Sequence, residues 1–114
     1  MSNVAQINAE LIRLSGALAT AVIEYEVALK TTAQAQTDYE IAKAQAELKA
    51  DGTETQRKAE AVNATKELLR DFRIAKATER AYAARIESLQ TRMTATQTRA
   101  AFEREEMRLA GKVD

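Results

Sequence analysis

The basic residues in the second half of this sequence are the ones whose types and spacing could do chemistry. Residues 66–99 hold eight basic side chains against four acidic ones, and Arg85, Arg92 and Arg99 recur one heptad apart. Guanidinium groups repeated along one helix face could bind the phosphates of a nucleic acid. Candidate contacts of this basic stripe are Arg73, Arg80, Arg85, Arg92, Arg99 and, just beyond it, Phe102. The same spacing is typical of the solvated flank of a coiled coil, and acidic residues interrupt the stripe, so the flank interpretation is favoured.

Few other residues could act in catalysis. The chain has no cysteine and no histidine, which excludes thiolate nucleophiles, imidazole metal sites and serine-histidine-aspartate triads within one copy. Its three isolated glycines cannot form a phosphate-binding loop, and its carboxylates are not clustered like the ligands of a calcium loop. We therefore expect no enzyme activity, no catalytic residue, no cofactor and no metal.

The charge balance limits the classes of partner. Seventeen basic and seventeen acidic residues give a formal net charge of zero, so no overall field attracts nucleic acid or an anionic membrane. The most apolar window, Leu11 to Leu29, is interrupted by Arg13, Glu24 and Glu26, which leaves too few uncharged residues to span a membrane. A cleaved signal is not expected either, because the N-terminus has no basic segment and the window stays in phase with a longer helical pattern. The lack of cysteine fits a reducing compartment, and we expect a cytoplasmic protein with no membrane partner.

Long helices must position these residues, because strong helix formers dominate and proline is absent. In each half, apolar or small residues recur at alternating spacings of three and four, which predicts one coiled-coil seam per helix. The first seam is Val4, Ile7, Leu11, Leu14, Leu18, Ala21, Tyr25, Ala28, Thr32, Ala35, Tyr39, Ala42 and Ala46. The second is Ala61, Thr65, Leu68, Phe72, Ala75, Glu79, Tyr82, Ile86, Leu89, Met93, Thr96, Ala100, Glu103, Met107 and Ala110.

A single turn is predicted between the two seams. Asp51-Gly52 can end a helix, and Thr53 to Gln56 match a capping box that starts the next one. Ser2 or Asn3 would cap the first helix, and Gly111 would end the second. Because a short loop makes neighbouring helices antiparallel, we predict a single all-α domain over residues 1–114. It is a long two-helix coiled-coil hairpin with helices at about 3–50 and 56–110 and a turn at 51–55.

Symmetry about this turn predicts which residues lie opposite each other. Positions whose numbers sum to about 104 should pair, so that Leu11 faces Met93 and Leu18 faces Ile86. Tyr25 would face Glu79, and its hydroxyl could donate a hydrogen bond to that carboxylate, which would otherwise be costly on a seam. Phe102 to Leu109 should project beyond the start of the first helix.

Apolar residues off the first seam have no place in a two-helix hairpin. We expect them to mediate self-association, most simply as a two-fold dimer with a four-helix core. These candidate residues are Ile12, Val22, Ile23, Val27 and Leu29. Beside them, Ser15, Gly16, Ala19 and Thr20 form a low surface that another helix backbone could approach closely; a neutral glycine at an exposed position is the alternative explanation of Gly16.

Two segments carry a resemblance to known proteins. "YEIAKAQAELKADGTETQRKAEA" has a helix ending in a short polar turn, and "AYAARIESLQTRMTATQTRAAFERE" has a Tyr-to-Leu seam with a Thr/Gln/Arg-rich tail. Together they resemble the small coiled-coil proteins encoded in the early regions of tailed phages of Gram-positive bacteria. The resemblance implies an accessory role in the host cytoplasm, with no catalytic residues. Our leading expectation is a self-associating adaptor or inhibitor that binds another protein, and the alternative is a nucleic-acid-binding accessory protein of phage replication or recombination that uses the basic stripe.

Overall fold

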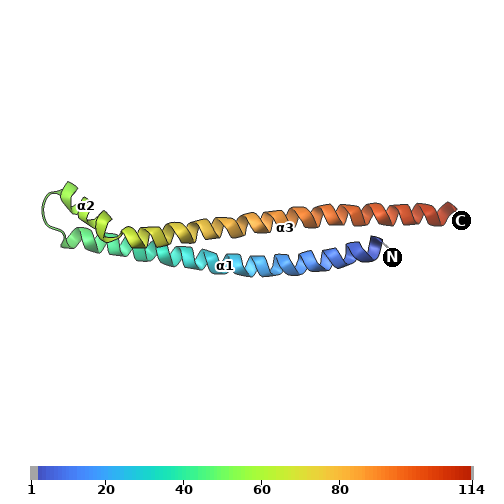
Figure 1. The fold of residues 1–114 in the computed structure, drawn as a ribbon, viewed down its shortest axis with the longest axis horizontal. Coiled ribbons are helices and arrows are strands. Elements are labelled where there is room, and N and C mark those ends of the chain that lie inside the picture. Colours follow the sequence, from blue (N-terminus) through green and yellow to red (C-terminus); the bar gives the residue numbers. More distant parts are fainter. Residues whose placement is uncertain (1–2, 114) are drawn as a thin grey trace. The chain divides into compact units, whose positions relative to one another are not determined.

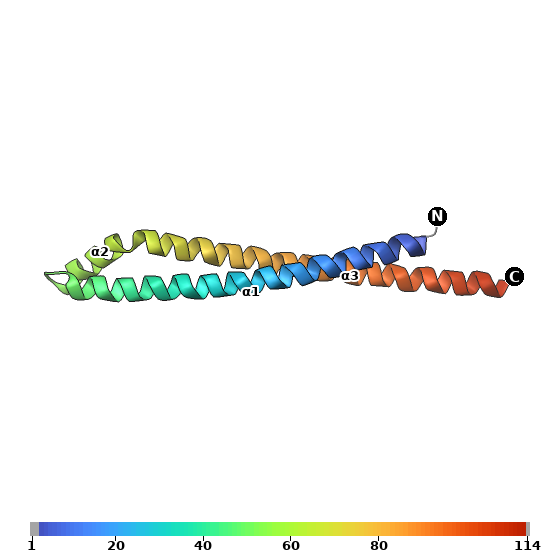
Figure 2. The same ribbon diagram turned by 90° about the horizontal axis from the view of Figure 1, so that it is seen from below.

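The computed structural model describes residues 3–113 and contains three helices in that range and no strand. They are α1 (Asn3–Lys49), α2 (Glu54–Ala64) and α3 (Lys66–Val113), and α1 turns back into α2 and α3 (Figures 1 and 2). The predicted all-α helical hairpin is confirmed. The chain divides into two compact units, of which unit 1 joins the residues up to Ile23 to those from Ala83 onward, and unit 2 runs from Glu24 to Tyr82.

The turn forms as the sequence predicts. Among the described residues Gly52 alone has a positive φ, of 103°, a conformation that a side chain would strain. Thr53 is the N-cap of α2: its hydroxyl accepts from the Gln56 backbone N–H at 3.2 Å, and its own N–H donates to Gln56 Oε1 at 2.9 Å. This reciprocal capping box satisfies two backbone donors that the helix itself leaves unpaired.

In unit 1 the two predicted seams pack against each other. Leu14, Ala21 and Leu89 are buried together, and the partly buried side chains packed against them are Ala17, Leu18, Ile86 and Met93. Leu18 and Ile86 both border this cluster. Ile7, nearer the start of α1, is also buried. Each helix of unit 1 thus contributes a single row of side chains to the apolar core.

In unit 2 the seam is built from smaller and more polar contacts. The Thr32 hydroxyl lies 2.9 Å from the Ala28 carbonyl oxygen on its own helix and 3.1 Å from the Ala75 carbonyl oxygen on α3. Tyr39 stacks on Phe72 with ring centroids 6.4 Å apart. The symmetry of the turn would instead have placed residue 65 opposite Tyr39. The shift arises because α2 runs obliquely to the neighbouring part of α1, as both ribbon views show, and therefore advances less along it.

The second arm is not one helix from about residue 56 to 110, because it breaks at Thr65. Thr65 has φ −112° and ψ 10°, outside helical geometry. Its backbone N–H and its hydroxyl both donate to the Ala61 carbonyl oxygen, at 3.1 Å and 2.7 Å. A hydroxyl that bonds back to the carbonyl four residues earlier often accompanies a bend in a helix. Both residues are buried, so this bend belongs to the packed seam.

Three further expectations are wrong or concern a residue outside the range that the structure describes. Tyr25 donates no hydrogen bond to Glu79 among the described residues; both are only partly buried, so water reaches the carboxylate and no internal donor is needed. Gly111 does not end the second helix, which continues to Val113, because this glycine keeps a negative φ. Asn3 lies inside α1 rather than capping it, and Ser2, the other proposed cap, lies outside the described residues.

Candidate interaction surface

The side of α1 away from α3 exposes large aliphatic side chains. Exposed fractions are 75% for Ile12, 63% for Ile23 and 59% for Val27, whereas Val22 and Leu29 keep only 38% and 39%. All five are thus accessible, as the sequence predicts. Ile12, Val22 and Ile23 belong to unit 1, and Val27 and Leu29 to unit 2.

Helix geometry explains why these residues stay exposed. At 3.6 residues per turn, one seam covers a single stripe of α1, and the first seam already supplies the buried residues Leu14, Ala21 and Ala28. Ile12 and Ile23 lie on the opposite side, where no element of unit 1 packs. Val22 and Leu29 lie beside the seam, so α3 partly covers them. In unit 1 the predicted surface is therefore centred on Ile12 and Ile23, and in unit 2 Val27 is more exposed than Leu29.

A second exposed apolar group was not predicted from the sequence. It lies in unit 2 near the turn and consists of Ile41 at 53%, Leu48 at 79% and Val62 at 54% exposure. The available signal was the same as for Ile12: each of these residues falls off its seam. Ile74, which also falls off its seam, is 56% exposed.

The end of α3 also exposes apolar side chains. Asn3 Nδ2 donates to Glu103 Oε1 at 3.5 Å, so the first described residue of α1 lies beside residue 103 in unit 1. Met107 at 58% and Leu109 at 50% exposure follow this point, where α1 has no described residues to pair with them, and Phe102 is 65% exposed. This agrees with the predicted projection of α3.

The structure separates the arginines of the basic stripe. Arg85, Arg92 and Arg99 lie in unit 1, and Arg73 and Arg80 in unit 2; all five are exposed. Arg92 reaches within 3.7 Å of the Glu10 carboxylate on α1. The pKa of Glu10 is lowered, chiefly by the hydrogen bond from Arg13; desolvation, the next largest effect, opposes this, and the charges of Arg13, Arg92 and Arg99 lower the pKa further. Arg92 and Arg99 therefore already interact with the Glu10 carboxylate of the same chain, as flanking residues of a coiled coil do.

Two aromatic rings near the stripe are occupied by the seam, whereas Phe102, just beyond the stripe, is exposed. Phe72 stacks on Tyr39, and the ammonium groups of Lys76 and Lys43 lie 5.8 Å and 5.9 Å from the centroids of the Phe72 and Tyr39 rings. Base stacking on a single strand requires a free ring face beside the basic residues. Sequence reasoning placed both rings on the seam but missed the two lysines that cover them.

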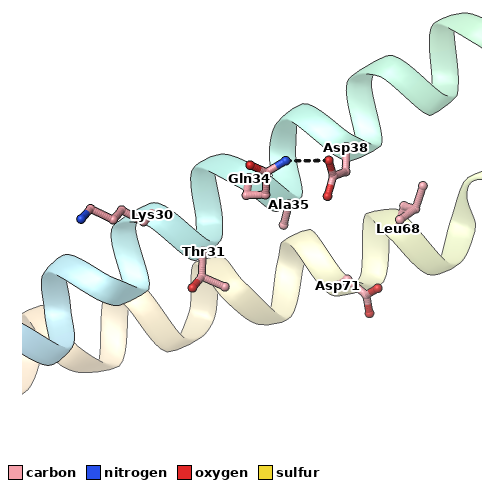
Figure 3. Close-up of a pocket in the computed structure, with 7 residues that line it drawn as sticks. All are labelled: Lys30, Thr31, Gln34, Ala35, Asp38, Leu68 and Asp71. Carbon is pink, nitrogen blue, oxygen red and sulfur yellow. Dashed lines mark hydrogen bonds between the residues drawn. The ribbon is translucent and has the colours of Figure 1, made fainter.

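An open groove in unit 2 is lined in part by charged residues (Figure 3). Gln34 Nε2 donates to Asp38 Oδ1 at 2.8 Å, and Lys30 extends away from Asp71. The groove is lined by Lys30, Thr31, Gln34, Ala35, Asp38, Leu68 and Asp71. No group of three or more metal-ligating His, Cys, Asp or Glu side chains gathers anywhere in residues 3–113. Because this groove is open and holds no such cluster, the exposed apolar side of α1 is a stronger candidate site than the groove.

Comparison of the chain with known protein families, with curated proteins and with solved structures found no match. Within the described part of the chain, no helix combines the length and the apolar character needed to cross a membrane.

Proposed function

We propose that this chain is a non-enzymatic, self-associating coiled-coil adaptor or inhibitor that acts by binding another protein. The observation that carries the proposal is the exposed aliphatic side of α1, where Ile12 and Ile23 are 75% and 63% exposed. Burying such a side chain is worth about 1.5 to 3 kcal/mol, so a second helix that covers this side gains considerable free energy. Contiguous exposed apolar side chains of this kind mark protein interaction sites.

The proposal includes a homodimer in the cytoplasm, and in the host cytoplasm if the chain is encoded by a phage. The cysteine-free sequence supports the reducing compartment, and the resemblance to early-region phage proteins supports the origin. A dimer is favoured among oligomers because one self-complementary surface is sufficient to close it.

Light scattering and a substitution on the exposed side test the proposal. The wild type should be a dimer at micromolar concentration, and an Ile12→Glu, Ile23→Glu double variant should dissociate because each carboxylate would be buried without a partner. A matched double variant, Thr37→Glu with Gln45→Glu, places the same charges at exposed polar positions of α1 and should remain a dimer. A monomeric wild type would contradict the self-association.

Nucleic-acid binding is the competing function, and the heptad spacing of Arg85, Arg92 and Arg99 is the observation that favours it. Binding to DNA that weakens steeply with salt and disappears when the three arginines are replaced by glutamine would favour this function over the adaptor. The contact between Arg92 and Glu10 supports the adaptor instead.

A further inference from the structure

The side of α1 away from α3 carries a heptad spacing of its own. Its members lie alternately four and three residues apart, and every one of them is exposed. They are Ala5, Ala9, Ile12, Gly16, Ala19 and Ile23, which we call the outer seam. Residues at these spacings align along one side of a helix, as coiled-coil contacts do. The outer seam lies wholly in unit 1, where both ribbon views show only α3 beside this part of α1.

We infer that the part of the outer seam from Ile12 to Ile23 binds the same segment of a second copy of this chain, with the two α1 helices antiparallel about a two-fold axis between residues 17 and 18. The inference rests on the self-association in the proposed function and assigns its geometry. In this register Ile12 of each copy packs against Ile23 of the other, and Gly16 packs against Ala19. Large residues therefore meet at both ends of the contact and small residues meet at its centre.

Gly16 supports this arrangement because its own chain does not require a glycine. Its φ is not positive, and an added Cβ would meet nothing within 4 Å outside the local backbone. Packing within the hairpin therefore leaves this glycine unexplained. A glycine opposite an alanine at the two-fold axis lets the helix backbones approach at the short end of the usual 8 to 10 Å range of interaxial distances. The isoleucines on either side can then make full contact.

The charges beside the outer seam favour the antiparallel direction. In a parallel pair in register, Arg13 of one copy and Glu24 of the other would lie eleven residues apart along the helix axis, so these opposite charges could not pair between the copies. In the antiparallel register Arg13 lies within two residues of the position opposite Glu24, on the same flank. The Arg13 side chain already pairs with Glu10 of its own helix yet remains 56% exposed. A guanidinium has five N–H donors, so it can bind both carboxylates.

Disulfide cross-linking of single-cysteine variants tests the direction, because the natural chain has no cysteine. Ile12→Cys and Ile23→Cys should cross-link to each other when the two variants are mixed, exchanged and oxidised. Each variant alone should cross-link at least ten-fold less, since its two thiols would lie about 16 Å apart along the helix axis. Arg99→Cys, exposed on α3, is the control that reports random collisions.

Replacing Gly16 tests the close approach. Gly16→Leu improves helix propensity and meets no neighbour in its own chain, so the hairpin should keep its helix content and melting behaviour at low concentration. The dimer dissociation constant should rise at least ten-fold. Gly111→Leu makes the same change at another helical glycine with open space around it and should leave the dimer unchanged.

The possible results separate the inference from the proposal on which it rests. A dimer in which Ile12→Cys cross-links to itself, or one that tolerates Gly16→Leu, would overturn the antiparallel outer-seam contact and leave self-association standing. A wild type that stays monomeric at high micromolar concentration would overturn both. Preferential mixed cross-links together with dissociation by Gly16→Leu would establish the contact.

Discussion

Replacement of Gly52 by alanine should destabilise the hairpin more than any other single methyl group added to the chain. The backbone at Gly52 has φ 103°, which costs a residue with a side chain about 1 to 2 kcal/mol. The added Cβ would also lie 2.3 Å from Gln56 Oε1. That oxygen accepts the Thr53 N–H, so the Gln56 side chain can move aside only by breaking the capping box, which costs about 1 kcal/mol. The two effects together amount to about 2 to 3 kcal/mol.

Thermal and urea unfolding followed by circular dichroism would measure this effect. For a chain of this size the loss corresponds to a decrease in melting temperature of about 10 °C. Gly111→Ala is the matched control: this glycine is helical with open space around it, so alanine there should be neutral or slightly stabilising. In a Gln56→Ala background, Gly52→Ala should cost only the backbone part, about 1 to 2 kcal/mol. A Gly52→Ala protein that melts within about 2 °C of the wild type would refute the reasoning.

Two other predictions concern the seam and its flank. Thr32→Val should lower the free energy of unfolding by about 0.5 to 1 kcal/mol, because it removes the hydroxyl that lies 3.1 Å from the Ala75 carbonyl oxygen of the opposite helix. Thr31→Val, whose hydroxyl donates only within α1, should be nearly neutral in the same urea titration, and equal effects at the two positions would contradict the role of the cross-helix contact. Replacing the three heptad-spaced arginines by glutamine should lower the melting temperature by less than about 5 °C, because exposed ion pairs contribute little; a larger decrease would show that they hold the hairpin together. The arginines concerned are Arg85, Arg92 and Arg99.

The two seams could be predicted from the sequence because they depend on local spacing alone. Every member of the first seam is buried or partly buried in the structure, and so is every member of the second up to Glu103. Met107 and Ala110 are exposed. Both residues fit the heptad spacing of the second seam, but α1 begins at Asn3, beside Glu103, and has no described residue to cover them.

The break at Thr65 could not be predicted from its residue type. Thr32 and Thr96 are also buried on a seam, and their hydroxyls also bond to the carbonyl four residues earlier, yet α1 and α3 continue through them. What differs is the position of Thr65 near the turn. Arg57 Nε donates to the Glu47 carbonyl oxygen at 3.1 Å and ties the start of α2 to the end of α1. The turn therefore sets the path of α2. The chain then changes direction at Thr65, where α3 begins and carries the rest of the second seam.

Sequence patterns identified the exposed aliphatic residues of α1 but not which of them are most accessible. A heptad assignment treats every residue off the seam alike, although a side chain beside the seam is partly covered by the neighbouring helix. The structure resolves this difference: Val22 and Leu29 retain 38% and 39% exposure, whereas Ile12 and Ile23 retain 75% and 63%. The free energy available to a partner therefore concentrates on the side of α1 that also holds Gly16. In the proposed dimer, a helix that covers Ile12 and Ile23 together must cross Gly16 between them, so the close backbone approach and the aliphatic contacts would fall in the same interface.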